Sequence, residues 1–330
     1  MGGASFPLTV VNQIEPAIGA LIAQMDSRIR VVNQARNVSE PWKTEGADIL
    51  LTGPSTAWKN APATPPATWH PARWVQIASA GTDGFPQWFL EAQPVSTGRG
   101  NAAVPIAEYV LLAMLAHVRR FETFRVSSPQ EWSQQGGTVN YDAPLRTLSG
   151  QTLGLAGYGA IGREVARLAR SFGMEVRVWR RSPWLDGEEA REGVQAVRDL
   201  GTLFGEADHL VLALPLTDET HRIVDRDVLS RSRPGLHLVN VARGALIDED
   251  ALLESLDRGL LAAATLDVTS PEPPPAGHRF YTHPGIRLTP HVSWSGPGVA
   301  AHLRERITRN IENFLHGRPL ESLLDPRRGY

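Results

Sequence analysis

Two polar side chains directly follow short apolar runs in the second half of the chain, and a third lies in a loop just beyond another run. Arg243 follows "LHLVNVA", and His291 closes the run "IRLTPH". Glu272 lies in the loop "SPEP", just beyond Asp267 at the end of "AATLDV". Apolar runs of this kind predict buried strands, and ligands of open α/β sheets bind at the carboxyl ends of the strands. We therefore expect a guanidinium, a carboxylate and an imidazole to converge at one edge of a sheet.

This trio suits the reduction of a carbonyl group that lies next to a carboxylate. Negative charge develops on the carbonyl oxygen, and a protonated His291 can donate a proton to it. Glu272, if hydrogen-bonded to the ring, would hold its orientation, and Arg243 can clamp the substrate carboxylate. Each residue taken alone has an ordinary structural explanation, such as a strand-end salt bridge. The expectation rests on their joint placement.

A glycine pattern upstream predicts a nucleotide-binding turn. The segment "GLAGYGAIGREVARLARSFGMEVRVW" contains an apolar strand, three spaced glycines, an amphipathic helix and a second strand. Gly157 permits the tight turn, Gly159 lets a pyrophosphate approach the backbone, and Gly162 lets the helix pack closely. The helix begins near Ala160 and Ile161, where its amides can donate to phosphate.

The acid that usually follows the second strand of such a unit is missing. An Asp or Glu about 20 residues into the motif normally binds the ribose hydroxyls. Here Arg180, Arg181 and Ser182 stand at this place. A guanidinium pairs bidentately with phosphate, so the sequence predicts a preference for NADPH over NADH, with NADH still possible. Two solvated arginines at a strand end are the alternative, and the sequence does not decide which arginine would bind the 2′-phosphate.

The sequence predicts α/β structure for the elements that must position these residues. Short β-branched runs alternate with helix-length segments over residues 7–99 and again over 152–293. Near-continuous apolar strands separated by helices are typical of parallel sheets covered on both faces. We therefore predict two doubly wound domains, a long helix over 105–125 between them, and an amphipathic helix in the tail, 297–320.

Bulk composition narrows the class of protein. A chain of 330 residues suits two domains, and a net charge of -2 gives no electrostatic reason for a nucleic-acid or membrane partner. The chain has no cysteine, and its first residues lack the pattern of a signal peptide. No metal site is predicted, and a cytoplasmic location is expected.

From Gly150 to Trp294 the chain resembles the D-isomer-specific 2-hydroxyacid dehydrogenases. The matching pieces are "LSGQTLGLAGYGAIGREVARLARSFGMEV", "ADHLVLALPLTDETHRIV", "VNVARGALIDEDALLESL", "TLDVTSPEP" and "LTPHVSW". The resemblance implies Arg243, Glu272 and His291 as catalytic residues. It further implies cofactor contacts from the glycine loop, Leu214–Pro215, Val241–Arg243 and, toward the nicotinamide amide, Asp267.

The resemblance also implies an architecture. A flavodoxin-like substrate domain would comprise residues 1–101 plus 295–330, with a Rossmann cofactor domain, 102–294, inserted into it. The loop "SAGTDG" would hold the substrate carboxylate through Ala80, Gly81 and Thr82, and the active site would lie in the cleft between the domains. The long helix in this family helps to build a homodimer.

The implied activity is NADPH-dependent reduction of small 2-keto acids to D-2-hydroxy acids, with glyoxylate and hydroxypyruvate as first candidates. Trp294 stands where many relatives carry a small residue, and it either shapes the substrate pocket beside His291 or packs away from it. Formate and phosphite dehydrogenases are alternatives within the enzyme class. A nucleotide-sensing, corepressor-like binding protein on the same fold is the alternative outside it.

Overall fold

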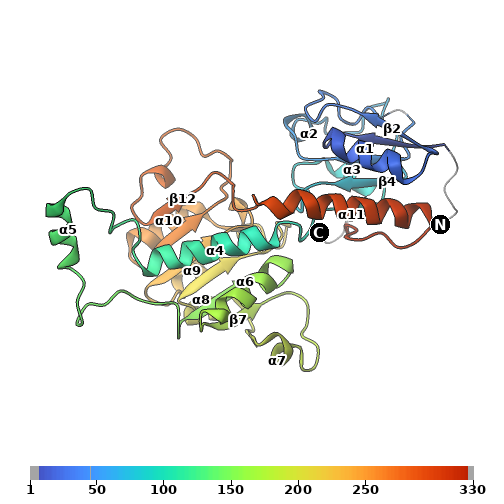
Figure 1. Cartoon of the computed structure of the whole chain (residues 1–330). Coiled ribbons are helices and arrows are strands. Elements are labelled where there is room, and N and C mark those ends of the chain that lie inside the picture. The colour runs from blue at the N-terminus through green and yellow to red at the C-terminus, as the bar shows by residue number, and fades with distance from the viewer. Residues whose placement is uncertain (1–6, 45, 326–330) are drawn as a thin grey trace. The chain divides into compact units, whose positions relative to one another are not determined.

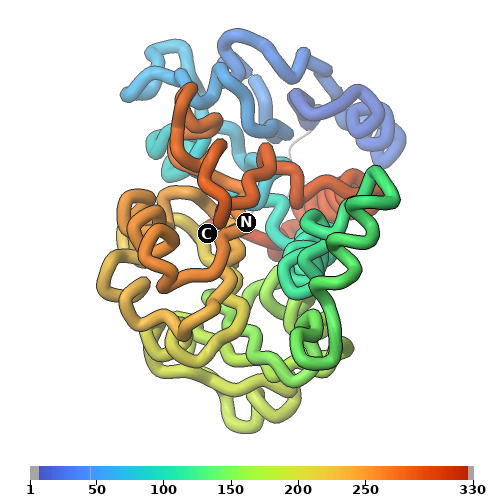
Figure 2. Tube along the Cα trace, turned by 90° about the vertical axis from the view of Figure 1, so that its left-hand side faces the viewer, coloured from blue at the N-terminus to red at the C-terminus, as the bar shows by residue number. Residues whose placement is uncertain are grey.

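The computed structural model describes residues 7–44 and 46–325, and this part of the chain forms two compact units. The first unit contains the segment up to residue 101 and the segment from 296 onward, and the second contains residues 102–295. The sequence-based boundary was placed between residues 294 and 295. In Figures 1 and 2 the second unit is one continuous run of colours, from teal through yellow to orange, inserted between the blue and red segments of the first.

The first unit is built on a five-stranded parallel sheet. Its strands are β1 (Leu8–Asn12), β2 (Ile29–Asn33), β3 (Ile49–Thr52), β4 (Trp74–Ile77) and β5 (Val95–Ser96), in the order β2-β1-β3-β4-β5. Its helices are α1 (Pro16–Met25), α2 (Thr56–Lys59), α3 (Gln87–Glu91) and α11 (Pro297–Leu315). Ile307 and Ile311 of α11 are buried against β1, β3 and α1, as the apolar stripe of the tail predicts.

The second unit is built on a seven-stranded parallel sheet in the order β12-β11-β10-β9-β6-β7-β8. Its strands are β6 (Thr152–Ala156), β7 (Glu175–Trp179), β8 (Gln195–Ala196), β9 (His209–Leu212), β10 (Leu236–Asn240), β11 (Leu261–Leu266) and β12 (Ile286–Leu288). The direction of winding reverses between β6 and β9, which is where doubly wound sheets bind ligands. The predicted α/β fold with two parallel sheets is confirmed, although β8 was not anticipated because it is short and exposed.

The helices of the second unit are α4 (Ala103–Val118), α5 (Pro129–Gly136), α6 (Ala160–Ser171), α7 (Glu188–Glu192), α8 (Leu200–Glu206), α9 (Arg226–Ser230) and α10 (Glu249–Asp257). The expected long helix over 105–125 is wrong at its end, because α4 stops at Val118 and Arg120 takes a left-handed conformation. Pro105 lies in the first turn of α4, where its missing N–H costs nothing. In the described part of the chain, no helix is both long and apolar enough to cross a membrane.

Three histidines cluster at the amino ends of two strands of the second unit, with His209 and His237 buried and His117 half-buried. His209 is the first residue of β9 and His237 the second residue of the neighbouring β10, and their Nδ1 atoms are 3.1 Å apart. His209 Nε2 lies 2.9 Å from Gln151 Oε1, so that nitrogen carries a proton and His209 Nδ1 must accept the proton of His237 Nδ1. His237 Nε2 then accepts from Thr265 Oγ1, at 2.9 Å, and the His117 ring stacks on His237 at 4.3 Å. The arrangement suits neutral rings.

We expect this cluster to make the fold sensitive to acid. Burial, with the charges of His117 and Arg146, lowers the pKa of His209 to about 3, and burial also lowers the pKa of His237, which the charges of His117, His209 and Arg287 lower further. The unfolded chain protonates these rings near pH 6.5, so unfolding takes up protons below that pH. The free energy of unfolding should then fall by up to about 1.4 kcal/mol per pH unit for each histidine.

Urea unfolding at pH 7.5, 6.5 and 5.5 measures this dependence. His237→Asn should have a shallower slope than the wild-type chain, whereas His316→Asn, which alters an exposed histidine just after α11, should keep the wild-type slope. Equal slopes for His237→Asn and the wild type would contradict the assignment.

Candidate active site

Arg243 lies in a turn just after β10 that is shaped by the last residue of the strand. Asn240 is fully buried, and its Nδ2 donates to the carbonyl oxygen of Arg243 at 2.8 Å. The amide of Ala242 donates to Asn240 Oδ1 at 3.0 Å. Arg243 Nη1 donates to the carbonyl oxygen of Ala242 at 2.7 Å, which keeps the guanidinium near the strand end.

Gly244 lets the turn that carries Arg243 approach the loop that carries Glu272. A Cβ at Gly244 would lie 2.1 Å from the carbonyl carbon of Thr269 and 2.5 Å from the amide of Ser270. Real Cβ atoms do not approach backbone so closely, so a side chain here would force the two loops apart. The glycine after Arg243 thus has a packing role that the sequence did not reveal.

Glu272 and His291 form a hydrogen-bonded pair. His291 Nδ1 is 3.1 Å from Glu272 Oε2, and the amide of Thr269 donates to Glu272 Oε1 at 3.3 Å. Because an ionised carboxylate only accepts, Nδ1 carries the proton and Nε2 is the nitrogen left to exchange a proton with a ligand. The two side chains are 40% and 33% exposed, so the pair is reachable from solvent.

The charges in this cluster favour an ionised Glu272. Burial is the largest single effect and raises the pKa of Glu272. The hydrogen bond and charge of His291, the amide of Thr269 and the charge of Arg243 together outweigh it, so the pKa of Glu272 is lowered. The structure therefore brings the three expected residues into one electrostatically coupled group at the carboxyl ends of β10, β11 and β12.

Asp267 follows β11 and is 1% exposed. Its Oδ1 accepts from Thr289 Oγ1 at 2.6 Å and from the amide of Val292 at 2.9 Å, and its Oδ2 accepts from the amide of Ser293 at 2.9 Å. The carboxylate thus binds the segment on both sides of His291. The sequence placed Asp267 correctly at a strand end but did not indicate these internal partners.

Trp294 is tied to the backbone of His291. Its Nε1 donates to the carbonyl oxygen of His291 at 2.9 Å, and the side chain remains half exposed. An indole fixed in this way is available to contact a bound ligand on its apolar face.

The glycine turn between β6 and α6 fits a dinucleotide. Gly157 has a φ of +101°, and a Cβ there would lie 2.5 Å from the carbonyl oxygen of Ala213. A Cβ at Gly162 would lie 2.5 Å from the carbonyl oxygen of Gly157. At Gly159, by contrast, no described atom other than those of its chain neighbours lies within 4 Å of that position. The backbone at Gly159 therefore borders open space, next to the first-turn amides of Ala160 and Ile161 that have no intrahelical acceptor.

The neighbouring expected cofactor residues lie at the same sheet edge. Leu214 and Pro215 follow β9, and the Leu214 side chain borders Gly157. Val241 follows β10 and is buried. These positions flank the point where the winding of the sheet reverses.

The two arginines after β7 have different environments. The Arg180 side chain is 11% exposed, forms a two-point ion pair with Glu188, and stacks on Trp184 with its guanidinium carbon 3.7 Å from the ring centroid. It also donates to the carbonyl oxygens of Ser182 and Pro183. Its hydrogen bonds lower the pKa of Glu188 to about 2. Arg180 is thus engaged within this loop, whereas the sequence left open which of the two arginines would bind a 2′-phosphate.

Arg181 is the more accessible arginine. Its side chain is 45% exposed and pairs with Glu219, at 2.8 Å, whose own side chain is 71% exposed. An ion pair this exposed to water contributes little stability and exchanges readily for another anion.

The expected carboxylate-binding loop belongs to the first unit. Ala80, Gly81 and Thr82 follow the carboxyl end of β4, with Thr82 buried and Ala80 exposed. Ser79 Oγ donates to the carbonyl oxygen of Gly81 at 2.7 Å, and the amide of Gly98 donates to the carbonyl oxygen of Ser79 at 2.7 Å. The loop is thereby braced against the segment after β5.

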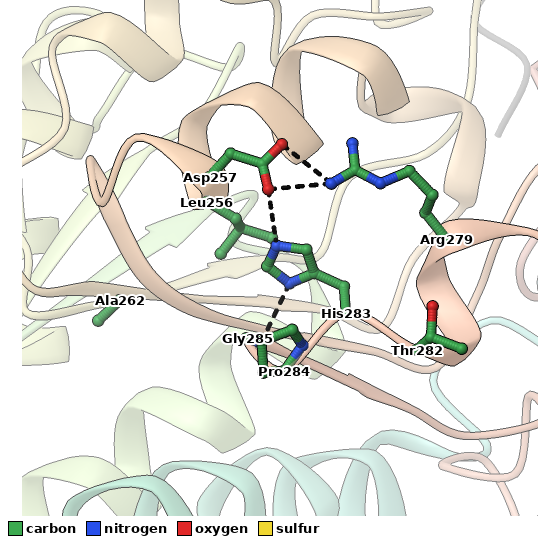
Figure 3. Close-up of a pocket in the computed structure, with 8 residues that line it drawn as sticks. All are labelled: Leu256, Asp257, Ala262, Arg279, Thr282, His283, Pro284 and Gly285. Carbon is green, nitrogen blue, oxygen red and sulfur yellow. Dashed lines mark hydrogen bonds and ion pairs between the residues drawn. The ribbon is translucent and has the colours of Figure 1, made fainter.

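A separate hollow of about 540 Å³ lies at the amino ends of β11 and β12, the edge of the sheet opposite to His291. Figure 3 shows Asp257 between Arg279, at 2.9 Å, and His283, at 3.3 Å. His283 Nδ1 accepts the amide of Gly285 at 3.1 Å, so both ring nitrogens are occupied. His283 is therefore not available to act as a base, and we assign a structural role to the cluster that it forms with Asp257 and Arg279.

Comparisons with known proteins agree with the fold. The model of the NAD binding domain of D-isomer specific 2-hydroxyacid dehydrogenases matches residues 111–293. The chain therefore belongs to the D-isomer-specific 2-hydroxyacid dehydrogenase family and is an oxidoreductase of that class. The family model and the nucleotide-bound structural neighbour below support a nicotinamide dinucleotide as cofactor.

Two curated relatives and one solved structure illustrate the similarity. Glyoxylate/hydroxypyruvate reductase A of Serratia proteamaculans is 30% identical over 321 residues, 88% of this chain and 96% of that protein. Glycerate dehydrogenase of Methylorubrum extorquens is 30% identical over 250 residues, 74% of this chain and 76% of that protein. The NADPH-dependent glyoxylate/hydroxypyruvate reductase of Sinorhizobium meliloti, solved with NADP and sulfate, has a TM-score of 0.74 at 25% identity, covering 99% and 100% of the two chains.

Proposed function

We propose that this protein reduces small 2-keto acids to D-2-hydroxy acids with NADPH, glyoxylate and hydroxypyruvate being the first candidates. The observation that carries the proposal is the His291–Glu272 pair, coupled to Arg243 at the carboxyl edge of a nucleotide-binding sheet. The names of the relatives from Serratia and Sinorhizobium support the substrate class, and the arginines after β7 support the cofactor.

The proposed roles follow from the geometry. The nicotinamide supplies the hydride when it is bound. Nε2 of protonated His291 donates a proton to the carbonyl oxygen, and Glu272 keeps Nδ1 as the bonded nitrogen. Arg243 pairs with the substrate carboxylate and stabilises the charge that develops on oxygen.

Other contacts in this proposal come from the family resemblance. The amides of the 80–82 loop would hold the substrate carboxylate, and Asp267 would contact the nicotinamide amide. Trp294, tethered beside His291, would limit the size of the substrate side chain.

The test is NADPH oxidation, followed by absorbance, over a panel of glyoxylate, hydroxypyruvate, pyruvate and phenylpyruvate. Turnover of the smaller acids supports the proposal. Tight NADPH binding without turnover of any acid would instead favour the nucleotide-sensing alternative. Reduction of NAD by formate or phosphite would favour those dehydrogenases.

Arg181 is the residue that we expect to recognise the 2′-phosphate. Arg181→Ala should raise the KM for NADPH about tenfold, because one charge-assisted pair contributes roughly 1.5–3 kcal/mol, and should leave the KM for NADH nearly unchanged. Arg231→Ala removes a surface arginine paired with Asp227 and serves as the control. An equal change in both KM values would contradict the role of Arg181. Glu219→Gln should lower the NADPH KM, since it removes the competing anion.

The proposals for assembly and location follow the family resemblance. We expect a homodimer, as in the family, and large apolar side chains exposed on and after α4 are consistent with self-association. They are Leu112, Phe121, Trp132 and Tyr141. A cytoplasmic location is likewise proposed.

A further inference from the structure

A chain of hydrogen bonds links helix α4 to the loop that carries His291. The Tyr109 hydroxyl on α4 lies 2.6 Å from Thr289 Oγ1, and Thr289 Oγ1 lies 2.6 Å from Asp267 Oδ1. Asp267 in turn accepts the amides of Val292 and Ser293, both at 2.9 Å. The chain thus joins residues 109, 267 and 289–293, which lie far apart in the sequence and come together only in the folded second unit.

The direction of this chain follows from its members. The Asp267 carboxylate only accepts hydrogen bonds, so the single hydroxyl proton of Thr289 points to Asp267. The Tyr109 hydroxyl must then donate to Thr289 Oγ1. Burial raises the pKa of Tyr109, so this donor keeps its proton across the physiological range. Each polar atom in the chain therefore has a defined partner.

The segment held by this chain contains an unfavourable backbone conformation. His291 has a φ of +53°, in the left-handed region that a residue other than glycine rarely adopts. Its amide donates to the carbonyl oxygen of Thr289 at 3.0 Å, which closes a tight turn between the anchored residues. Such a conformation persists only where the surroundings fix it on both sides. Here Thr289 is fixed before His291, and Val292 and Ser293 are fixed after it.

We propose that Tyr109, Thr289 and Asp267 are positioning residues that hold His291 in this left-handed conformation and so aim its ring at Glu272 and at the reacting carbonyl. The inference rests on the proposed function for the role of His291 itself. In this proposal Asp267 positions the loop that carries His291, in addition to making the nicotinamide contact that the family resemblance implies. It also connects α4, for which the sequence predicted no site residue, to the loop that carries His291 through the Tyr109–Thr289 hydrogen bond.

Thr289→Val tests the proposal with little change in side-chain volume. It removes the link to Asp267, and displacement of a catalytic group by about 1 Å can lower a rate about 100-fold. We expect kcat to fall about 10- to 100-fold, with the NADPH dissociation constant within about twofold of wild type. Tyr109→Phe, which removes only the first donor, should lower kcat less. Thr289→Ser restores the hydroxyl and should recover most of the rate.

Thr265→Val is the control, because it deletes the hydroxyl of a buried threonine on β11 that serves the histidine cluster instead of the loop around His291. It should leave kcat unchanged even if it lowers the melting temperature. The proposal is overturned if Thr289→Val keeps the wild-type kcat, or if Thr265→Val and Thr289→Val lower kcat equally.

Hydrogen exchange gives a readout that does not depend on turnover. In the cofactor-free protein, Thr289→Val should speed exchange in peptides covering residues 289–295 and not in those covering 157–165. If the wild type reduces no 2-keto acid, the proposed function fails while this measurement still tests the anchoring of the loop. Unchanged exchange in 289–295 would overturn the anchoring itself.

Discussion

His291→Asn is expected to lower kcat for 2-keto acid reduction by about 100- to 10,000-fold, the range that a positioned general acid contributes. Asparagine is close in size and can still donate a hydrogen bond to Glu272, so the loop should retain its shape. It cannot deliver a proton to the carbonyl oxygen. The dissociation constant for NADPH should change little, because the glycine turn and the arginines after β7 are separate from this ring.

Stopped-flow reduction under single-turnover conditions, with NADPH binding measured by fluorescence, separates the two effects. His316→Asn is a suitable control, because it alters an exposed histidine of the first unit whose Nδ1 lies 2.8 Å from the carbonyl oxygen of Glu312. A variant that retains more than about a tenth of the wild-type kcat would remove His291 from the proton-donor role.

Gly159→Ala is expected to weaken cofactor binding without weakening the fold. The φ of Gly159 is -88°, outside the left-handed region that disfavours alanine, and no described atom other than those of its chain neighbours lies within 4 Å of the added Cβ. Replacing a glycine under these conditions leaves stability unchanged or raises it by roughly 0.4–1 kcal/mol. The methyl group would, however, occupy the space through which a pyrophosphate approaches the backbone. The dissociation constants for NADPH and NADH should both rise at least about tenfold, since the pyrophosphate is common to both.

Isothermal titration with each nucleotide and a thermal melt check both parts of this expectation. Gly136→Ala in α5, where the added Cβ meets no described atom within 4 Å apart from the chain neighbours and the backbone of the helix itself, controls for the change of residue type. If Gly159→Ala binds NADPH as tightly as the wild type, the turn does not hold the pyrophosphate. If it instead melts well below the wild type, the open space at Gly159 is misassigned.

Gly162 differs from Gly159 in what surrounds its Cα. A Cβ at Gly162 would meet the carbonyl oxygen of Gly157 at 2.5 Å, so its substitution should damage the fold as well as binding. The three glycines share one motif but differ in physical role. The contrast separates packing within the chain from space left for a ligand.

Local sequence patterns were sufficient for the sheets and for the placement of the main polar groups. Continuous apolar runs must be buried on both faces, so the strands other than the short, exposed β8 could be predicted from the residues alone, with their carboxyl ends. Arg243, Asp267 and His291 were placed at strand ends for the same reason. The glycine spacing likewise predicted the turn between β6 and α6, because the turn needs residues without a side chain at those positions.

Only the tertiary structure decided which partners the polar groups take. The sequence does not distinguish the neighbouring residues Arg180 and Arg181. In the structure Arg180 is packed against Glu188 and Trp184, whereas Arg181 is accessible. The contacts of Tyr109 with Thr289, and of Gly244 with Thr269, likewise join positions that no local pattern relates. A periodic pattern specifies which face of an element is buried, but a hydrogen bond between distant segments depends on how the whole unit packs. For that reason the residues that hold His291 in place emerged only from the folded structure.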